Sequence, residues 1–317
     1  MGTIAFLFPG QGAHAVGMGK DFYSEFKTVR KIFKKTESLT GIEIRKLCFD
    51  GPMQDLTQTA NLQPCLTVMN LSILAALKER TSVSADFCAG HSLGEYSALY
   101  CANVLSFENT IRVVMKRGRL MQREANIHPG KMLAILKLPV DKVEEILNDY
   151  KPEGPIGIAN YNSQSQTVIA GAADIIKKIS KHLRKSGGLC VPLNVSGAWH
   201  SELVWGAYEE FESYLNEISF HSAAIPNIFN TNADIENDPN KIKTIMSKQF
   251  CQPVRWSDSV LKLASCKVDT FIEIGPGKVL TGLLSKILPS DYSYRAYNID
   301  TLDSLNSFIA DSKVQLI

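Results

Sequence analysis

The sequence predicts an α/β protein with a parallel sheet in its core and a small ferredoxin-like subdomain inserted into it. Three observations support this fold class. Short apolar runs alternate with helical patterns along the 317 residues. A strand–turn–helix pattern surrounds the segment G-H-S-L-G-E at residues 90–95. A β-α-β-β-α-β order, which is the ferredoxin-like motif, is expected over residues 131–197. The large core would then comprise residues 1–130 and 198–317.

The composition is typical of a globular enzyme. Hydrophobic residues make up 45% and charged residues 21%, which argues against wholesale disorder. The net charge of +2 is too small to indicate nucleic acid as the main partner. No apolar run approaches the roughly 18 residues that a membrane span needs, and residues 4–8 are too few for a signal-peptide core. We therefore expect a cytoplasmic protein with neither a membrane nor a nucleic-acid partner.

The cysteines are odd in number and scattered, and no C-x-x-C pattern occurs among them. Such a set favours buried free thiols in a reducing cytoplasm over disulfides or a zinc site. The seven positions are Cys48, Cys65, Cys88, Cys101, Cys190, Cys251 and Cys266.

The first elements precede the central motif. Residues 4–8 predict a buried strand that ends in the loop P-G-Q-G. The glycines of this loop do not complete G-x-G-x-x-G, and no G-K-[ST] follows, so a nucleotide-binding loop is rejected. A helix is expected over residues 22–36 and a polar loop over residues 55–62, after which Pro64 opens a helix that runs to about residue 79.

Ser92 lies in the sequence context of a nucleophile elbow. The apolar residues 87–89 precede it, and the helix-forming residues 95–102 follow. In such a turn the serine hydroxyl is exposed at the apex. Gly90 and Gly94 avoid the crowding that a Cβ would cause at either shoulder. The alternative is a glycine-bounded loop with an incidental serine. This alternative does not explain why a strand pattern precedes the serine and a helix pattern follows it.

The remaining elements continue the α/β pattern. A basic helix that contains Arg117 is expected over residues 108–123. The predicted subdomain consists of strand 132–138, helix 141–150, strands 156–160 and 166–170, helix 174–186 and strand 190–195. Beyond it we expect helices at 201–215, 241–249, 258–265 and 279–287 and strands at 225–229 and 270–274.

A serine nucleophile needs a base within hydrogen-bond reach, and His200 is the candidate among six histidines. It stands in S-G-A-W-H-S, where the small subdomain returns the chain to the core. A domain junction lines a cleft, and the small residues leave room for a ligand. A surface histidine, or one whose hydrogen bonds are satisfied in the core, is the alternative.

Six segments, in order along essentially the whole chain, resemble the malonyl-CoA:acyl carrier protein transacylase family. This set is far more specific than G-x-S-x-G alone. The segments are F-P-G-Q-G at 8–12, Q-T-A-N-L-Q-P at 58–64, G-H-S-L-G-E at 90–95, N-Y-N-S at 160–163, V-S-G-A-W-H-S at 195–201 and E-I-G-P-G at 273–277.

The resemblance implies a hydrolase-like α/β core and a set of site residues. Ser92 would be the nucleophile and His200 the base. The backbone N–H groups of Gln11 and Leu93 would form the oxyanion hole, which needs donors already in place. Arg117 would bind the malonyl carboxylate, for which a planar, always charged guanidinium is well suited.

Three further residues receive roles from the resemblance. The backbone carbonyl of Gln249 would orient His200 in place of an acidic residue. Asn160 and Trp199 would contact the substrate, and the bulk of Trp199 would exclude α-branched acyl units. No metal or redox cofactor is implied.

The implied reaction is ping-pong transfer of malonyl from malonyl-CoA to the phosphopantetheine thiol of acyl carrier protein. Two alternatives remain. An acyl-thioester hydrolase would turn over rapidly without carrier protein, and Arg117 argues against it. A non-catalytic carrier-protein docking module would show damage at Ser92, His200 or Arg117, which are all present. Whether the carrier serves fatty-acid or polyketide synthesis stays open.

Charge is unevenly distributed along the chain. Residues 131–197 contain nine Lys and Arg against six Asp and Glu. Lys177, Lys181 and Lys185 repeat at i, i+4 and i+8 along one face of the predicted helix 174–186. Because carrier proteins are usually acidic, we expect this face to steer the carrier toward Ser92. A solvated helix face without a partner is the alternative.

Overall fold

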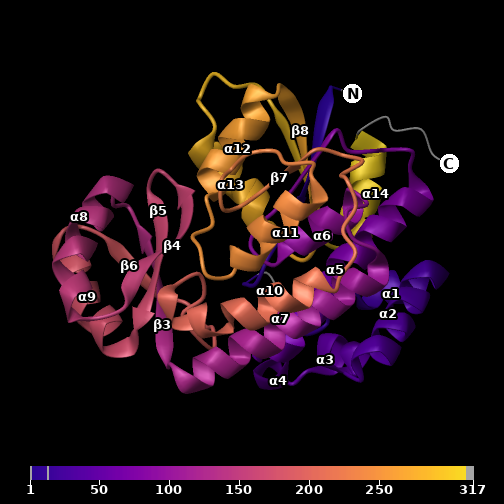
Figure 1. Cartoon of the computed structure of the whole chain (residues 1–317). Helices are drawn as coiled ribbons and strands as arrows, with labels where there is room; N and C mark the ends of the chain where they lie inside the picture. The colour runs from indigo at the N-terminus through magenta and orange to yellow at the C-terminus, as the bar shows by residue number, and fades with distance from the viewer. Residues whose placement is uncertain (1, 13, 312–317) are drawn as a thin grey trace.

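The chain forms a mixed α/β fold with one parallel and one antiparallel sheet (Figure 1); this computed structural model describes residues 2–12 and 14–311. The parallel sheet has the strand order β7-β2-β1-β8-β9. Its strands are β1 (Thr3–Phe8), β2 (Phe87–Gly90), β7 (Asn227–Ile228), β8 (Val268–Ile274) and β9 (Arg295–Ile299).

The side chains of the parallel sheet alternate between two apolar layers. In β1, Phe6 and Phe8 contribute to the core that contains α5 (Thr59–Arg80) and α6 (Gly94–Cys101). Ala5 and Leu7 face the opposite side, where α12 (Trp256–Ser265) and α13 (Val279–Ile287) pack. A strand buried on both faces reads as a continuous apolar run, which is the pattern seen in the sequence.

The other helices of the large region extend these layers. They are α1 (Lys20–Glu25), α2 (Lys27–Thr40), α3 (Ile44–Asp50), α4 (Met53–Thr57), α7 (Phe107–Ile127), α10 (Tyr208–Asn216), α11 (Pro239–Lys248) and α14 (Leu302–Asp311). The expected helix 22–36 divides into α1 and α2 because Phe26 adopts an extended conformation and is buried. The expected helix 201–215 begins as a 3-10 helix (Glu202–Ala207) before α10.

The antiparallel sheet is built from residues 130–192 and has the order β4-β5-β3-β6. Its elements are β3 (Gly130–Leu136), α8 (Val140–Tyr150), β4 (Ile156–Ser163), β5 (Gln166–Ala172), α9 (Ala173–Lys185) and β6 (Leu189–Pro192). One face of this sheet packs Leu133, Ile135 and Ile169 against α8 and α9. The other face turns Met132 and Val168 toward the large region. The two helices therefore lie on the outer side of the sheet (Figure 1).

The polar loop expected over residues 55–62 is wrong, because α4 ends at Thr57 and α5 begins at Thr59. The first turn of α5 is held by α7: the side chain of Gln122 accepts the Thr59 N–H at 3.1 Å. A Cβ on Gly118 would lie 2.9 Å from the Thr59 carbonyl oxygen, so the two helices approach closely there. Pro64 consequently sits inside α5 rather than opening it.

Helix α5 is the segment to compare with the expectation that no apolar run approaches the length of a membrane span. Within the described residues, α5 qualifies by length and composition, with a mean hydropathy of 1.3 over its most apolar window. However, 83% of that window is buried inside the protein, which is the environment of a core helix. The seven cysteines are free as expected, and six of them are buried.

Candidate active site

The turn between β2 and α6 has the geometry of a nucleophile elbow. Ser92 has a φ of 51°, in the left-handed region that favours glycine. A Cβ on Gly90 would lie 2.1 Å from the backbone of Gly94, and a Cβ on Gly94 would lie 2.0 Å from the Phe8 carbonyl oxygen. The prediction that neither shoulder tolerates a side chain is therefore confirmed.

The hydroxyl of Ser92 meets the imidazole of His200, although the two residues are 108 positions apart in the sequence. The distance from Ser92 Oγ to His200 Nε2 is 2.7 Å. His200 Nδ1 lies 3.0 Å from the Gln249 carbonyl oxygen and 2.8 Å from that of Gln252. Because both carbonyls can only accept, Nδ1 carries the proton, and Nε2 is left with its lone pair toward Ser92.

The environment of His200 keeps the imidazole neutral. Burial, together with the nearby charge of Arg117, lowers the pKa of His200 to about 3, even though the two carbonyl bonds oppose the shift. A neutral imidazole with an open Nε2 can accept a proton from a hydroxyl or a thiol. The arrangement therefore suits general-base chemistry at neutral pH.

Arg117 comes from the middle of α7 and is only 1% exposed. Its Nη2 donates to Gln249 Oε1 at 3.0 Å and reaches Ser92 Oγ at 3.4 Å. Its Nε and Nη1 are buried and have no hydrogen-bond partner among the described residues. Burial lowers the pKa of Arg117, while Tyr96 and Glu95 act in the opposite direction. A buried guanidinium with unused donors beside the serine is able to hold an anionic group.

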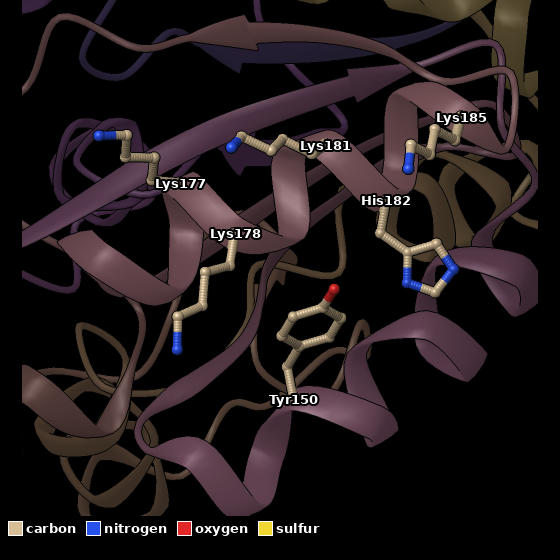
Figure 2. A pocket seen from close by; sticks show the side chains of 6 residues that line it. All are labelled: Tyr150, Lys177, Lys178, Lys181, His182 and Lys185. Carbon is tan, nitrogen blue, oxygen red and sulfur yellow. The ribbon is translucent and has the colours of Figure 1, made fainter.

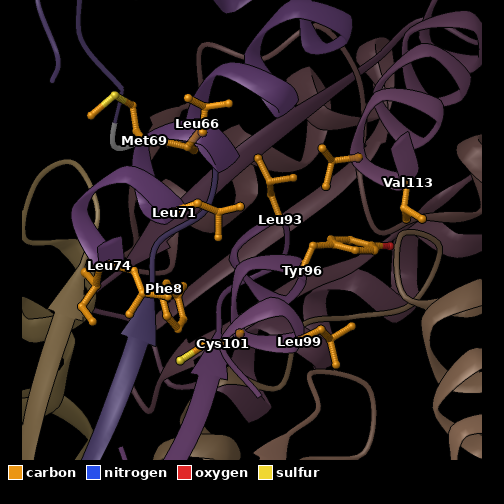
Figure 3. Packing of buried hydrophobic residues seen from close by; sticks show 14 of the residues in the cluster. Phe8, Leu66, Met69, Leu71, Leu74, Leu93, Tyr96, Leu99, Cys101 and Val113 are labelled. Carbon is orange, nitrogen blue, oxygen red and sulfur yellow. The ribbon is translucent and has the colours of Figure 1, made fainter. Parts of the chain in front are cut away.

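Gln11 and Leu93 lie at the carboxyl ends of neighbouring parallel strands. Leu93 directly follows Ser92, so its backbone N–H belongs to the turn. Its side chain points into the core, where it lies with Leu66 and Tyr96 (Figure 3). Gln11 lies in the loop after β1 and lines the cavity that contains Ser92. That loop is close to the elbow, since a Cβ on Gly10 would lie 2.4 Å from the His91 carbonyl oxygen.

A cavity of about 220 Å³ is lined by Ser92 and Gln11, whereas Arg117 lies behind its wall, next to Ser92. One wall comes from the antiparallel sheet and includes Asn160, Met132 and Val168, and another comes from α13. Trp199 and His200 also line the cavity. The structure thus brings Asn160 and Trp199 to the same space as Ser92. The side chain of Trp199 is 3% exposed, and its Nε1 has no partner among the described residues.

Several groups around the elbow were not predicted from the sequence. The carbonyl of Gln252 is closer to His200 than that of Gln249. Asn230, just beyond β7, uses its side-chain oxygen to accept the Ser92 N–H at 2.7 Å. Glu95, the last residue of G-H-S-L-G-E, is fully buried. The position of Asn230 at the carboxyl end of a strand was a usable signal, since active-site groups gather at that edge.

The lysine face of α9 lies away from this cavity. Lys177, Lys181 and Lys185 are exposed on α9, which covers the outer side of the antiparallel sheet, whereas the opposite face of the sheet lines the cavity. Figure 2 shows Lys178 and His182 on the side of α9 that faces Tyr150. The structure therefore does not bring these lysines next to Ser92.

Comparisons with known proteins identify the family of this chain. The acyl transferase domain family model matches residues 5–313. The malonyl CoA-acyl carrier protein transacylase of Staphylococcus aureus (strain MRSA252) is 38% identical over 97% of this chain and 99% of the relative. That of Bacillus subtilis (strain 168) is 38% identical over 90% of this chain and 91% of the relative.

Solved structures give the same result. A malonyl CoA-acyl carrier protein transacylase from Clostridium perfringens is 34% identical, with a TM-score of 0.92 over 98% of this chain and 97% of that chain. A malonyl-transacylase in complex with its type II PKS acyl-carrier protein is 31% identical, with a TM-score of 0.93 over 98% and 99% of the two chains. This chain therefore belongs to the acyl transferase domain family and, within it, to the malonyl-CoA:acyl carrier protein transacylases.

Proposed function

We propose that this chain transfers a malonyl group from malonyl-CoA to the phosphopantetheine thiol of an acyl carrier protein. The observation that carries the proposal is the buried Arg117 guanidinium, which has two unused nitrogens and lies 3.4 Å from Ser92 Oγ. An acyl group that ends in a carboxylate would satisfy those donors while its carbonyl carbon lies at the serine. A hydrolase for simple acyl groups has no use for a buried cation there.

The first half-reaction begins at Ser92. Its Oγ attacks the thioester carbonyl carbon as the hydroxyl proton passes to His200 Nε2. The N–H groups of Gln11 and Leu93 stabilise the oxyanion. When the tetrahedral intermediate collapses, the carbon–sulfur bond breaks and the CoA sulfur takes the proton from His200. The malonyl group remains on Ser92 as an ester, with its carboxylate on Arg117.

The second half-reaction uses the same groups in reverse. The thiol of the carrier protein gives its proton to neutral His200 Nε2, and the sulfur attacks the ester. Ser92 leaves and recovers the proton. These steps call on no metal or redox cofactor. Asn160 and Trp199 would shape the wall of the cavity around the acyl group and the thiol-bearing arm, and the bulk of Trp199 would disfavour α-branched units.

The domain organisation follows from the same interpretation. We infer that residues 131–197 form a ferredoxin-like subdomain and that residues 1–130 and 198–317 form a hydrolase-like core. The support is the strand order β4-β5-β3-β6 with two helices on one face, beside a parallel sheet that bears the elbow. A cytoplasmic location remains a prediction, supported by the seven free thiols.

The two-step mechanism is tested by intact-mass measurement after mixing with malonyl-CoA and then with carrier protein. The wild-type chain should gain one malonyl group and lose it to the carrier. Ser92→Ala should gain none, because Ser92 Oγ is the hydroxyl that is hydrogen-bonded to His200 Nε2. Ser24→Ala, which changes an exposed serine on α1, should load normally. A malonyl ester on the Ser92→Ala chain would contradict the mechanism.

Arg117→Ala should weaken malonyl loading by more than tenfold, which corresponds to about 2–5 kcal/mol for losing a buried, charge-assisted partner. Acetyl loading should be spared or improved, because acetyl leaves the guanidinium unpaired beside His200. Rates from both CoA esters should be compared with those of Arg119→Ala, an exposed arginine on the same helix. Equal losses for malonyl and acetyl would show that Arg117 is only structural.

We also propose that the carrier protein is attracted by Lys177, Lys181 and Lys185, which lie with Lys178 on the exposed side of α9 (Figure 2). Because this face lies on the outer side of the sheet, its effect is long-range steering. Lys181→Glu with Lys185→Glu should slow transfer to the carrier, most strongly at low salt, and leave loading from malonyl-CoA normal.

The matched control for this charge reversal is Lys27→Glu with Lys31→Glu. These exposed lysines are also four residues apart, but they lie on α2 at the other end of the molecule (Figure 1). Unchanged carrier kinetics in the α9 variant, or the same loss in the α2 variant, would place the docking surface elsewhere.

A further inference from the structure

Two side-chain amides hold the backbone of Ser92 from both sides. Asn230 Oδ1 accepts the Ser92 N–H at 2.7 Å, while Asn230 Nδ2 donates to the Gly90 carbonyl oxygen at 2.7 Å. Gln249 Nε2 donates to the Ser92 carbonyl oxygen at 2.8 Å. A serine with positive φ is strained and persists only where the surroundings determine its conformation. The two amides provide that constraint.

Both supporting residues meet at a single carboxylate. Glu95 Oε1 accepts the backbone N–H of Asn230 at 2.9 Å, and Glu95 Oε2 accepts Gln249 Nε2 at 3.0 Å. Glu95 is fully buried at the start of α6. Burial raises the pKa of its carboxyl group to about 8, although both N–H donors and the charge of Arg117 oppose the rise. The geometry shows that both carboxyl oxygens accept a hydrogen bond, one from Asn230 and one from Gln249.

The orientation of the Gln249 amide follows from its neighbours. Arg117 has only donors, and its Nη2 donates to Gln249 Oε1 at 3.0 Å. A carboxylate has only acceptors, so Glu95 requires the NH2 end of the same amide. When the Gln249 oxygen points toward Arg117 and its nitrogen toward Glu95, both hydrogen bonds form. If the Gln249 amide turned over, donors would face donors and acceptors would face acceptors, and both bonds would be lost.

We propose that Glu95 is a positioning residue for malonyl transfer: it orients the Gln249 amide, which in turn holds the Arg117 guanidinium in place for the malonyl carboxylate. This inference rests on the proposed function. Among the described residues, the hydrogen-bond partners of the Glu95 side chain are Asn230 and Gln249, so it acts through these two. The proposal gives a role to a buried carboxyl group that none of the steps of transfer uses.

Glu95→Gln tests the proposal with almost no change in shape. The backbone N–H of Asn230 cannot turn away, so the oxygen of the new side-chain amide at position 95 must accept it. The NH2 group of that amide then faces the NH2 group of Gln249, and two donors oppose each other. If Gln249 turns over to accept the new NH2 group, the Gln249 NH2 group faces Arg117 instead. The ratio of malonyl to acetyl loading rates, measured by quenched intact-mass spectrometry, should fall about tenfold.

The double variant Glu95→Gln with Gln249→Glu separates positioning from general damage. A carboxylate at position 249 can accept from both the new amide and Arg117, so the malonyl-to-acetyl ratio should recover. The Ser92 carbonyl oxygen would then face a carboxylate and keep only the backbone N–H of residue 95 as its donor, so both loading rates should stay below those of the wild type. The carbonyl of residue 249 that binds His200 is unchanged in either variant.

Glu273→Gln is the matched control. This glutamate is also fully buried and accepts backbone N–H groups, those of Leu280 and Thr281 in α13, but it makes no contact with the elbow. It should reduce stability, read as the melting temperature, and leave the malonyl-to-acetyl ratio at the wild-type value. Should Glu95→Gln not fold, Gln249→Met removes the same link to Arg117 and should lower the ratio in the same way.

The possible outcomes are distinct. An unchanged ratio in Glu95→Gln, or a double variant that does not recover it, overturns the positioning role. An equal fall of the ratio in Glu273→Gln also overturns it, because the loss of any buried carboxylate would then produce the effect. If the wild-type chain forms no malonyl ester, the proposed function itself is contradicted. If the wild-type chain loads malonyl and Glu95→Gln keeps the same malonyl-to-acetyl ratio, only this inference is contradicted.

Discussion

The hydrogen bond between Ser92 Oγ and His200 Nε2, at 2.7 Å, is the interaction on which the rest of the site depends. Each of its two residues has a positive φ, 51° for Ser92 and 58° for His200. Conformations of this kind are costly for residues with a Cβ, so the surrounding structure must offset the strain. Small residues at the elbow allow the close approach, and buried amides and carbonyls hold both residues in place.

Within the part of the chain that the structure describes, backbone carbonyls rather than an acidic side chain bind His200 Nδ1, and the electrostatics of the site follow from this. A carboxylate beside Nδ1 would favour the imidazolium, whereas two backbone carbonyls fix the tautomer without adding charge. Arg117 makes the imidazolium still less favourable. A bound malonyl carboxylate would offset the guanidinium charge and make it easier for His200 to take a proton. Substrate selection and activation of the base are then linked through the same arginine.

The sequence allowed Ser92 and the two glycines of the elbow to be predicted, because a tight strand-to-helix turn imposes local constraints that leave a pattern. The alternating apolar runs likewise predicted most strands. Pairing Ser92 with His200 required either the fold or the family resemblance, since nothing local joins residues 108 positions apart. The start of α5 was missed because its first turn depends on Gln122 of α7, a contact that propensity does not register.

The other omissions have the same physical origin. Glu95 and Gln252 act through hydrogen bonds to distant residues, and an isolated Glu or Gln carries no sequence signature of such a bond. The position of Asn230 after a predicted strand was a signal for the site, but its bond to Ser92 depends on the fold. Charge periodicity identified the lysine face of α9 correctly as an exposed stripe. It could not tell on which side of the sheet the stripe would lie, because a helix can cover either face.

The central claim, that His200 is a neutral base with its proton on Nδ1, is tested most directly by nitrogen-15 NMR of the histidine side chains. The signals of His200 can be assigned by comparison with His200→Gln, since the chain has six histidines. Because burial and Arg117 lower the pKa to about 3, His200 should stay neutral, with Nδ1 protonated, from pH 8 down to pH 5. Protonation with a midpoint near its ordinary value of about 6.5, or a proton on Nε2, would contradict the account.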